Sequence, residues 1–169
     1  MLLRWIICFE GFGSKDMYRL VLMSSILIGV LGIPANSQPL EEDGKAFNPY
    51  SETALAITGP VILSTKRMVF ETGAFLQLDL VEQAASGSWG VSGDVPLAQV
   101  FRVTGDAGSL RGGNTVCGDG TVTYMAAWDE ELSGSKYLGI AMFTGTEIPT
   151  GAIEEGTCAT FFYSIDLAR

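Results

Sequence analysis

Apolar and polar residues alternate with a period of two along much of this chain. In FLQLDLVEQ, residues 75–83, Leu76, Leu78 and Leu80 fall on one face of an extended strand, and the polar residues fall mostly on the other. VILSTKRMVF, residues 61–70, alternates in the same way. No window of useful length has the 3.6-residue period of an amphipathic helix, which disfavours βαβ architectures.

Further segments of strand character follow, separated by Gly-rich turns. Between the two segments above, ETGA is predicted to be a hairpin turn because Gly73 can take positive φ. With those two, the chain has about eight candidate strands, which predicts an all-β fold, either a small antiparallel β-barrel or a sandwich. The other six candidates are ALAITG (54–59), SGSWGVSG (86–93), PLAQVFRVTG (96–105), TVTYMAAWDEEL (121–132), KYLGIAMFTG (136–145) and TCATFFYSID (157–166).

Two of these candidate strands, 136–145 and 157–166, are apolar on both faces. One face fills a core, so the other needs a cover: the amino-terminal arm, a short helix that the pattern does not reveal, or a partner subunit in a homodimer. An outer-membrane barrel is the rival explanation. Charges interrupt both faces of several strands and no aromatic girdle is evident, so we predict no stable membrane insertion.

The amino-terminal segment predicts export. From Met17 the chain has one basic residue, Arg19, followed by an apolar stretch from residue 20 to 33 and then the small residues Ala35 and Ser37. The apolar stretch is shorter than the roughly 20 residues of a spanning helix, and the small residues suit a cleavage site. An uncleaved membrane anchor is the alternative.

We therefore expect three regions. Residues 1–37 hold the signal peptide, with Met17 a candidate for the true start, and residues 38–53 form a polar, flexible lead-in with at most a docked Phe47 or Tyr50. Residues 54–169 form the antiparallel β-barrel domain. The mature protein is expected to be periplasmic or secreted.

The cysteines fit an exported protein. Cys8 precedes the predicted signal peptide, which leaves Cys117 and Cys158, and we predict a disulfide between these two. A zinc site is the alternative, and it is disfavoured because two cysteines stand without any histidine.

Composition excludes several chemistries. The formal net charge of −9 repels nucleic acid and anionic lipid and attracts cationic partners. The absence of histidine removes the Ser-His-Asp and Cys-His arrangements and the commonest metal ligand. Asp129, Glu130 and Glu131 are consecutive, so their side chains alternate in direction and resemble a solvated strand end. We predict no catalytic residue, no cofactor and no metal.

One short stretch carries a functional hypothesis. Leu132-Ser133-Gly134-Ser135 is predicted to connect two strands as a hairpin, with Gly134 permitting the tight bend. The stretch Ser133-Gly134-Ser135-Lys136-Tyr137 also resembles the Ser-Gly-x-x-Tyr motif of the periplasmic and membrane-bound inhibitors of c-type lysozyme. Those proteins are small, exported, disulfide-bearing antiparallel β-barrels whose motif loop enters the active-site cleft of the enzyme.

The resemblance implies that Ser133, Gly134 and Tyr137 contact a partner, and that Lys136 faces the catalytic carboxylates of the enzyme. It predicts that Ser133 and Tyr137 are exposed. The sequence thus favours an exported, non-enzymatic β-barrel that binds a cationic protein such as lysozyme. The alternatives are a lipocalin-like carrier of a small apolar ligand, a structural envelope protein, and a hydrolase that uses carboxylates.

Overall fold

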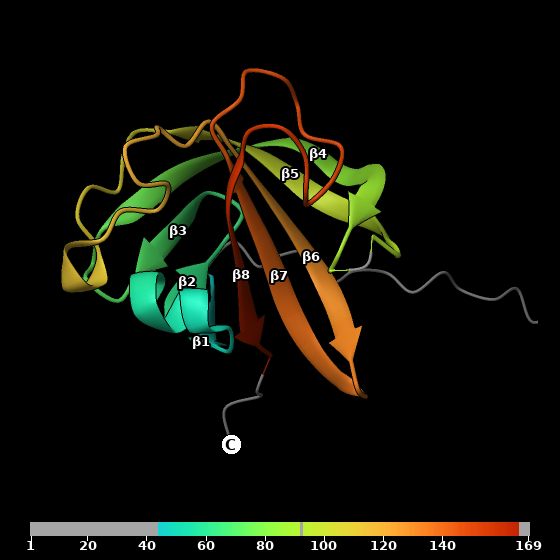
Figure 1. Cartoon of the computed structure of the whole chain (residues 1–169), viewed down its shortest axis with the longest axis horizontal. Coiled ribbons are helices and arrows are strands. Elements are labelled where there is room, and N and C mark those ends of the chain that lie inside the picture. Colours follow the sequence, from blue (N-terminus) through green and yellow to red (C-terminus); the bar gives the residue numbers. More distant parts are fainter. Residues whose placement is uncertain (1–43, 92, 166–169) are drawn as a thin grey trace, which may run out of the picture. The chain divides into compact units, whose positions relative to one another are not determined.

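The described part of the chain forms a closed antiparallel barrel (Figure 1). The structure is a computed structural model that describes residues 44–91 and 93–165. Eight strands follow one another around the barrel in chain order, and the first pairs with the last. They are β1 (Lys45–Pro49), β2 (Val61–Leu63), β3 (Arg67–Phe70), β4 (Phe75–Trp89), β5 (Val95–Thr104), β6 (Tyr124–Leu132), β7 (Ser135–Phe143) and β8 (Thr157–Ser164).

The all-β prediction is confirmed, and the architecture is a barrel rather than a sandwich. The predicted signal peptide, its cleavage site and Cys8 lie outside the described residues. Among the described residues, no helix has the length and apolar character needed to cross a membrane.

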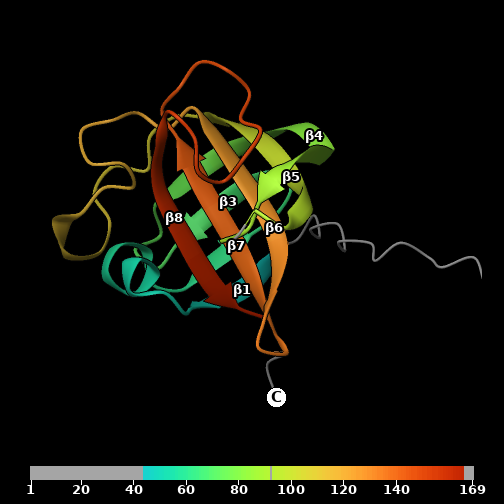
Figure 2. The same cartoon turned by 45° about the vertical axis from the view of Figure 1, so that its right-hand side comes forward.

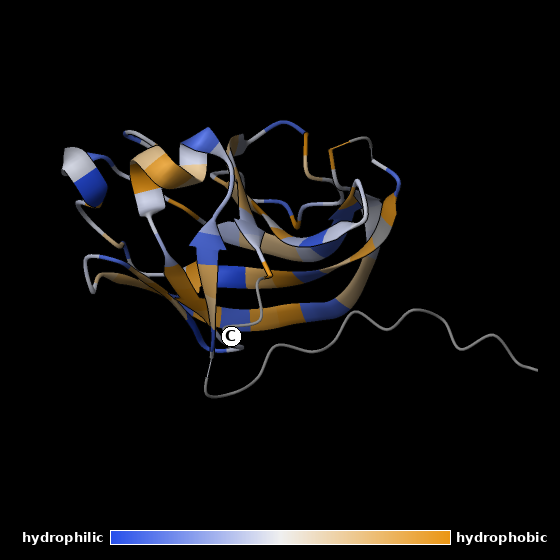
Figure 3. Ribbon diagram, turned by 90° about the horizontal axis from the view of Figure 1, so that it is seen from below, coloured by the Kyte–Doolittle hydropathy of each residue, from blue (hydrophilic) through white to orange (hydrophobic). Residues whose placement is uncertain are grey.

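Side chains from every strand fill the barrel interior. Alternation sends every second residue inward, and Figure 3 shows apolar and polar segments following one another along the strands. The buried set includes Phe47, Val61, Met68, Leu76, Phe101, Met125, Ile140 and Phe161, one from each strand in order. A polar contact lies among them, because the Tyr163 hydroxyl is 2.8 Å from Thr58 Oγ1. Burial raises the pKa of Tyr163 well above its usual range.

Two predictions for the amino-terminal part are wrong. Residues 54–59, predicted as a strand, form instead a single turn of helix, η1 (Ala54–Thr58). Ser51 Oγ accepts a hydrogen bond from the Ala54 N–H at its start, and Gly59, at φ 62°, ends it. The lead-in also contains β1, which pairs with β2 and β8 and buries Phe47, so residues 45–49 belong to the barrel.

Two other strand boundaries differ from the prediction. Residues 61–70 form two strands because Ser64 Oγ accepts hydrogen bonds from the N–H groups of Lys66 and Arg67, which makes a tight turn between β2 and β3. Residues 86–93 do not form a separate strand, since β4 continues through register shifts as far as Trp89. The ETGA turn is confirmed, with Gly73 at φ 85°.

A second apolar layer covers the outside of β6, β7 and β8. Beyond the first register shift, β4 and β5 form a flap (residues 82–98) whose Ala85 and Trp89 pack on the outer face of these strands. The loop of residues 144–156 completes the cover, because its backbone exchanges hydrogen bonds with Ser88. Figure 2 shows β6, β7 and β8 side by side, with this loop above them. Most of the cover predicted for the two-faced strands thus comes from the flap and this loop of the same chain, and the predicted arm contributes Tyr50 and Ser51, which contact Tyr137 and Phe162.

The layer contains a row of aromatic rings. The ring centroids of Trp89 and Trp128 lie 6.3 Å apart, and Phe162 meets Trp128 edge-on at 6.2 Å. Trp128 lies directly over Gly139 on the neighbouring strand, where a Cβ would come within 2.3 Å of the indole. Only glycine leaves room for the ring at this position.

We expect Gly139→Ala to lower the free energy of unfolding by about 1–3 kcal/mol, because the added methyl group overpacks against Trp128. Urea denaturation followed by tryptophan fluorescence measures the change. Gly145→Ala is the matched control, since a Cβ there meets no atom within 4 Å. Equal stability of the two variants would contradict the packing argument.

The predicted disulfide is confirmed. Cys117, in the long loop between β5 and β6, is bonded to Cys158 at the start of β8, with 5.3 Å between the Cα atoms. The bond ties this loop to the barrel wall. Two side chains hold the same loop against η1, since Arg111 and Asn114 donate hydrogen bonds to the Leu55 and Ala56 carbonyls.

Reduction should lower the free energy of unfolding by about 4 kcal/mol, the chain-entropy value for a bond that joins residues 41 apart. Urea unfolding with and without reductant measures the loss, and thiol titration verifies that the bond has been broken. An unchanged midpoint after complete reduction would contradict the expectation.

Candidate functional site

The β6–β7 hairpin ends in a two-residue turn. Leu132 pairs with Ser135, and the residues between them, Ser133 and Gly134, both have positive φ, 53° and 79°. This is the geometry of a type I′ turn, whose twist matches that of the strands it joins. The predicted hairpin connection is therefore confirmed, including the role of Gly134.

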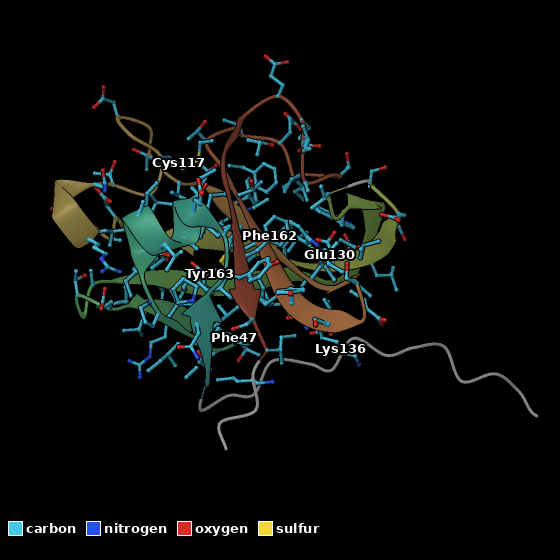
Figure 4. All side chains as sticks on the ribbon, turned by 60° about the horizontal axis from the view of Figure 1, so that its bottom comes forward. Phe47, Cys117, Glu130, Lys136, Phe162 and Tyr163 are labelled. Carbon is cyan, nitrogen blue, oxygen red and sulfur yellow. A yellow bond between two sulfur atoms is a disulfide. The ribbon has the colours of Figure 1, made fainter. Side chains whose placement is uncertain are left out.

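The hairpin extends past its neighbour on one side. β6 pairs with β7 along its whole length, whereas its register with β5 ends at Ala127. Residues 128–132 therefore pair with β7 alone, and the turn lies at the far end of the barrel from the disulfide loop (Figures 1 and 2). Figure 4 shows the same separation, with Lys136 at the hairpin end and Cys117 on the opposite side.

The four predicted site residues lie together at this end. Ser133, Gly134 and Lys136 are exposed, whereas Tyr137 is half-buried and so less exposed than the resemblance predicts. Its ring packs on Tyr50, with 4.3 Å between the centroids. A hydrogen bond to Tyr137 raises the pKa of Tyr50. We call the group formed by Tyr50, Asp129, Ser133, Lys136 and Tyr137 the hairpin-end surface.

Charge at the hairpin-end surface is mixed. Lys136 stands opposite Glu131 in the register of β6 and β7. The positive charges of Lys136 and Lys45 both lower the pKa of the Asp129 carboxyl. Partial burial raises the pKa of Asp129, and the two lysines oppose this only in part. The surface thus presents a lysine flanked by acids.

The burial of Glu130 differs from what the sequence predicts. The three consecutive acids were predicted to be a solvated strand end, but the Glu130 side chain is only 5% exposed. Trp128 Nε1–H donates to its Oε2 at 3.1 Å, and the Val91 N–H donates to its Oε1 at 3.0 Å. Because Val91 lies in the flap, Glu130 fastens the flap to the base of the hairpin.

Sequence reasoning missed Tyr50 as a member of the surface and Lys45 as a charge that acts on it. Both come near the hairpin because β1 pairs with β8, with Asn48 opposite Ser164. No local pattern reveals that pairing, which joins segments far apart in the chain. The aromatic character of Tyr50, noted in the lead-in, was the only available signal.

A shallow cleft lies elsewhere, beside the disulfide. Its lining includes Asn114, Cys117, Ile153, Thr157 and Cys158, a mixture of polar and apolar groups. In the part of the chain that the structure describes, no three acidic or cysteine side chains come together as metal ligands. The hairpin-end surface therefore remains the better candidate, because it brings together the residues that the motif singled out.

Comparison with known proteins gives no match to a family model, to a curated protein or to a solved structure.

Asp129→Asn is expected to raise the free energy of unfolding at neutral pH. The folded state raises the pKa of Asp129 above its ordinary 3.8, so its ionised form is disfavoured there relative to the unfolded chain. Below pH 3.8 the carboxyl is protonated in both states and the gain disappears. The stability gain of the variant grows as the pH rises from 3.8 through the folded-state pKa of Asp129.

Urea titrations at a series of pH values measure this gain. Asp119→Asn, on the exposed loop beside Cys117, is the control for removing one acid from an acidic protein. A stabilisation that is the same for both variants at every pH would refute the assignment to Asp129.

Proposed function

We propose that this chain is an exported, non-enzymatic binding protein that presents its hairpin-end surface to a cationic partner protein, with c-type lysozyme as the most concrete partner. The observation that carries the proposal is the two-residue turn at Ser133 and Gly134, set at the end of a hairpin that extends beyond β5. It displays Ser133, Gly134 and Lys136 at a narrow tip that suits a cleft, and Tyr137 lies at the base of this tip, where β7 pairs with β8.

The projection is braced before any partner arrives. β6 and β7 pair over nine residues, Glu130 fixes the base of the hairpin to the flap, and Tyr137 packs on Tyr50. A preorganised surface loses less conformational entropy on binding. This supports inhibition by simple occupation of a cleft, without chemical processing of the hairpin.

The charges suit a cationic partner that carries buried acids. The chain as a whole has a formal net charge of −9, which steers a basic protein toward it. Lys136 supplies an exposed ammonium beside the turn, able to donate charge-assisted hydrogen bonds to carboxylates within the cleft of the partner. Attraction at long range and a specific contact at short range then come from different residues.

The filled interior supports a surface site over a carrier. Among the described residues, buried side chains from all eight strands pack together inside the barrel, and this favours a surface site over the large apolar pocket that a lipocalin-like carrier requires. The exported location and the partner stay proposals, and measuring inhibition tests the partner.

The test is the inhibition of a c-type lysozyme by the purified, disulfide-bonded protein, assayed at several salt concentrations. Ser133→Ala/Tyr137→Ala should abolish inhibition, and Lys136→Glu should weaken it at least tenfold because a carboxylate then faces carboxylates. Inhibition by the unmodified protein should weaken as salt rises.

Two variants test whether the Ser133 hydroxyl itself, rather than the shape of the turn, is needed for inhibition. Ser133→Gly keeps the positive φ of the turn while removing the hydroxyl, and Ser109→Ala removes an exposed hydroxyl from another loop. Inhibition that persists in Ser109→Ala and falls in Ser133→Gly assigns the effect to the hydroxyl. No inhibition by the unmodified protein at micromolar concentration would reject lysozyme as the partner.

A further inference from the structure

An apolar row crosses the outer face of the first four strands. Ala46 pairs with Ile62, Ile62 with Val69 and Val69 with Phe75, so one residue from each of β1 to β4 stands in line across the sheet. Ile62 is 47% exposed and Phe75 is 52% exposed, while Val69 is half-buried. The flap and the 144–156 loop cover β6 to β8 and leave this row uncovered.

The charges beside the row have a symmetry of their own. On the outward side of the chain around β3, Arg67 precedes Val69 by two residues and Glu71 follows it by two. A second copy placed face to face, with the two-fold axis along the row, has its strands antiparallel to those of the first. Arg67 of one copy then faces Glu71 of the other, and the contact occurs twice.

The other residues that would face one another across the two-fold axis are compatible with this arrangement. On β4, Gln77 would face Gly73 of the other copy. Because the barrel wall is curved, Val69 and its neighbours Ile62 and Phe75 would meet their own counterparts, with Ala46 at the edge of the contact. No like charges oppose one another among these positions. Glu71 already lies 3.7 Å from Arg111 in its own chain, but its side chain is 47% exposed and remains open to a second cation.

We propose that the row Ala46–Ile62–Val69–Phe75 is the interface of a homodimer, closed on both sides by Arg67–Glu71 ion pairs. The partner is a second copy of this chain. Arg67, Val69 and Glu71 give β3 and the residue after it a positive, apolar, negative order, which is complementary to itself under two-fold rotation. The dimer uses the opposite part of the barrel wall from the covered strands β6 to β8. It is independent of the proposed partner at the hairpin-end surface.

Sedimentation velocity of the purified protein over a wide concentration range tests the proposal. We expect a reversible monomer–dimer equilibrium that Phe75→Asp abolishes. Arg67→Glu and Glu71→Arg should each raise the dimer dissociation constant about tenfold, since each variant turns two attractive contacts into repulsive ones. The double variant Arg67→Glu/Glu71→Arg should restore the dimer, because it exchanges the two charges.

Ile153→Asp is the matched control, since Ile153 is 78% exposed in the 144–156 loop, away from the row. It should leave the dimer unchanged, and circular dichroism of each variant checks the fold. A protein that stays monomeric throughout overturns the proposal, as does a dimer that survives Phe75→Asp. Failure of the double variant to restore association overturns the two-fold arrangement. Lysozyme inhibition should be the same in Phe75→Asp, so the two proposals fail separately.

Discussion

The outer face of β6, β7 and β8 has to be buried, and the rest of the structure depends on how the chain buries it. Trp128 is set over Gly139 there, with Trp89 and Phe162 beside it. The flap reaches this face only because β4 continues through its register shifts and bends with β5. The barrel is therefore two layers thick on one side and one layer thick on the other.

This unequal coverage places the hairpin-end surface. Because the flap leaves the line of the barrel at Ala98, β6 loses its neighbour after Ala127, while β7 stays paired with β8 as far as Tyr137. Only the residues around the turn extend beyond both neighbours as a two-stranded hairpin, and such a hairpin alone is only marginally stable in water. Here the buried Glu130 joins it to the flap, and the Tyr50–Tyr137 contact joins it to the chain that follows β1.

The sequence predicted the class and the disulfide, because the class depends on a local pattern and the disulfide on a count of cysteines. The predicted number of strands, about eight, also agrees, but two segments wrongly predicted as strands are offset by β1 and by the division of residues 61–70 into β2 and β3. The prediction failed at residues 54–59, where ALAITG is apolar without a period, so strand and helix could not be told apart. It failed at 61–70 because the alternation continues through a turn that the Ser64 hydroxyl makes.

The candidate site could be predicted only in its local part. The turn at Ser133 and Gly134 follows from the residues themselves, since glycine accepts the positive φ that a tight hairpin needs. The burial of Glu130 could not be read from its acidic neighbours, because the donor of one of its hydrogen bonds is Val91, 39 residues away. Such pairings arise from the fold as a whole.

The closure of the barrel between β1 and β8 has a consequence for how the protein reaches this state. Ser164 donates a hydrogen bond to the Asn48 carbonyl across a separation of 116 residues. A contact of that span forms late, because the entropy of closing so long a loop is lost before the contact contributes. Until β8 is made, β1 has only β2 as a hydrogen-bonded strand neighbour, so the barrel stays open at β1 until the last strand pairs with it. The strand made last thus closes the barrel onto the strand made first.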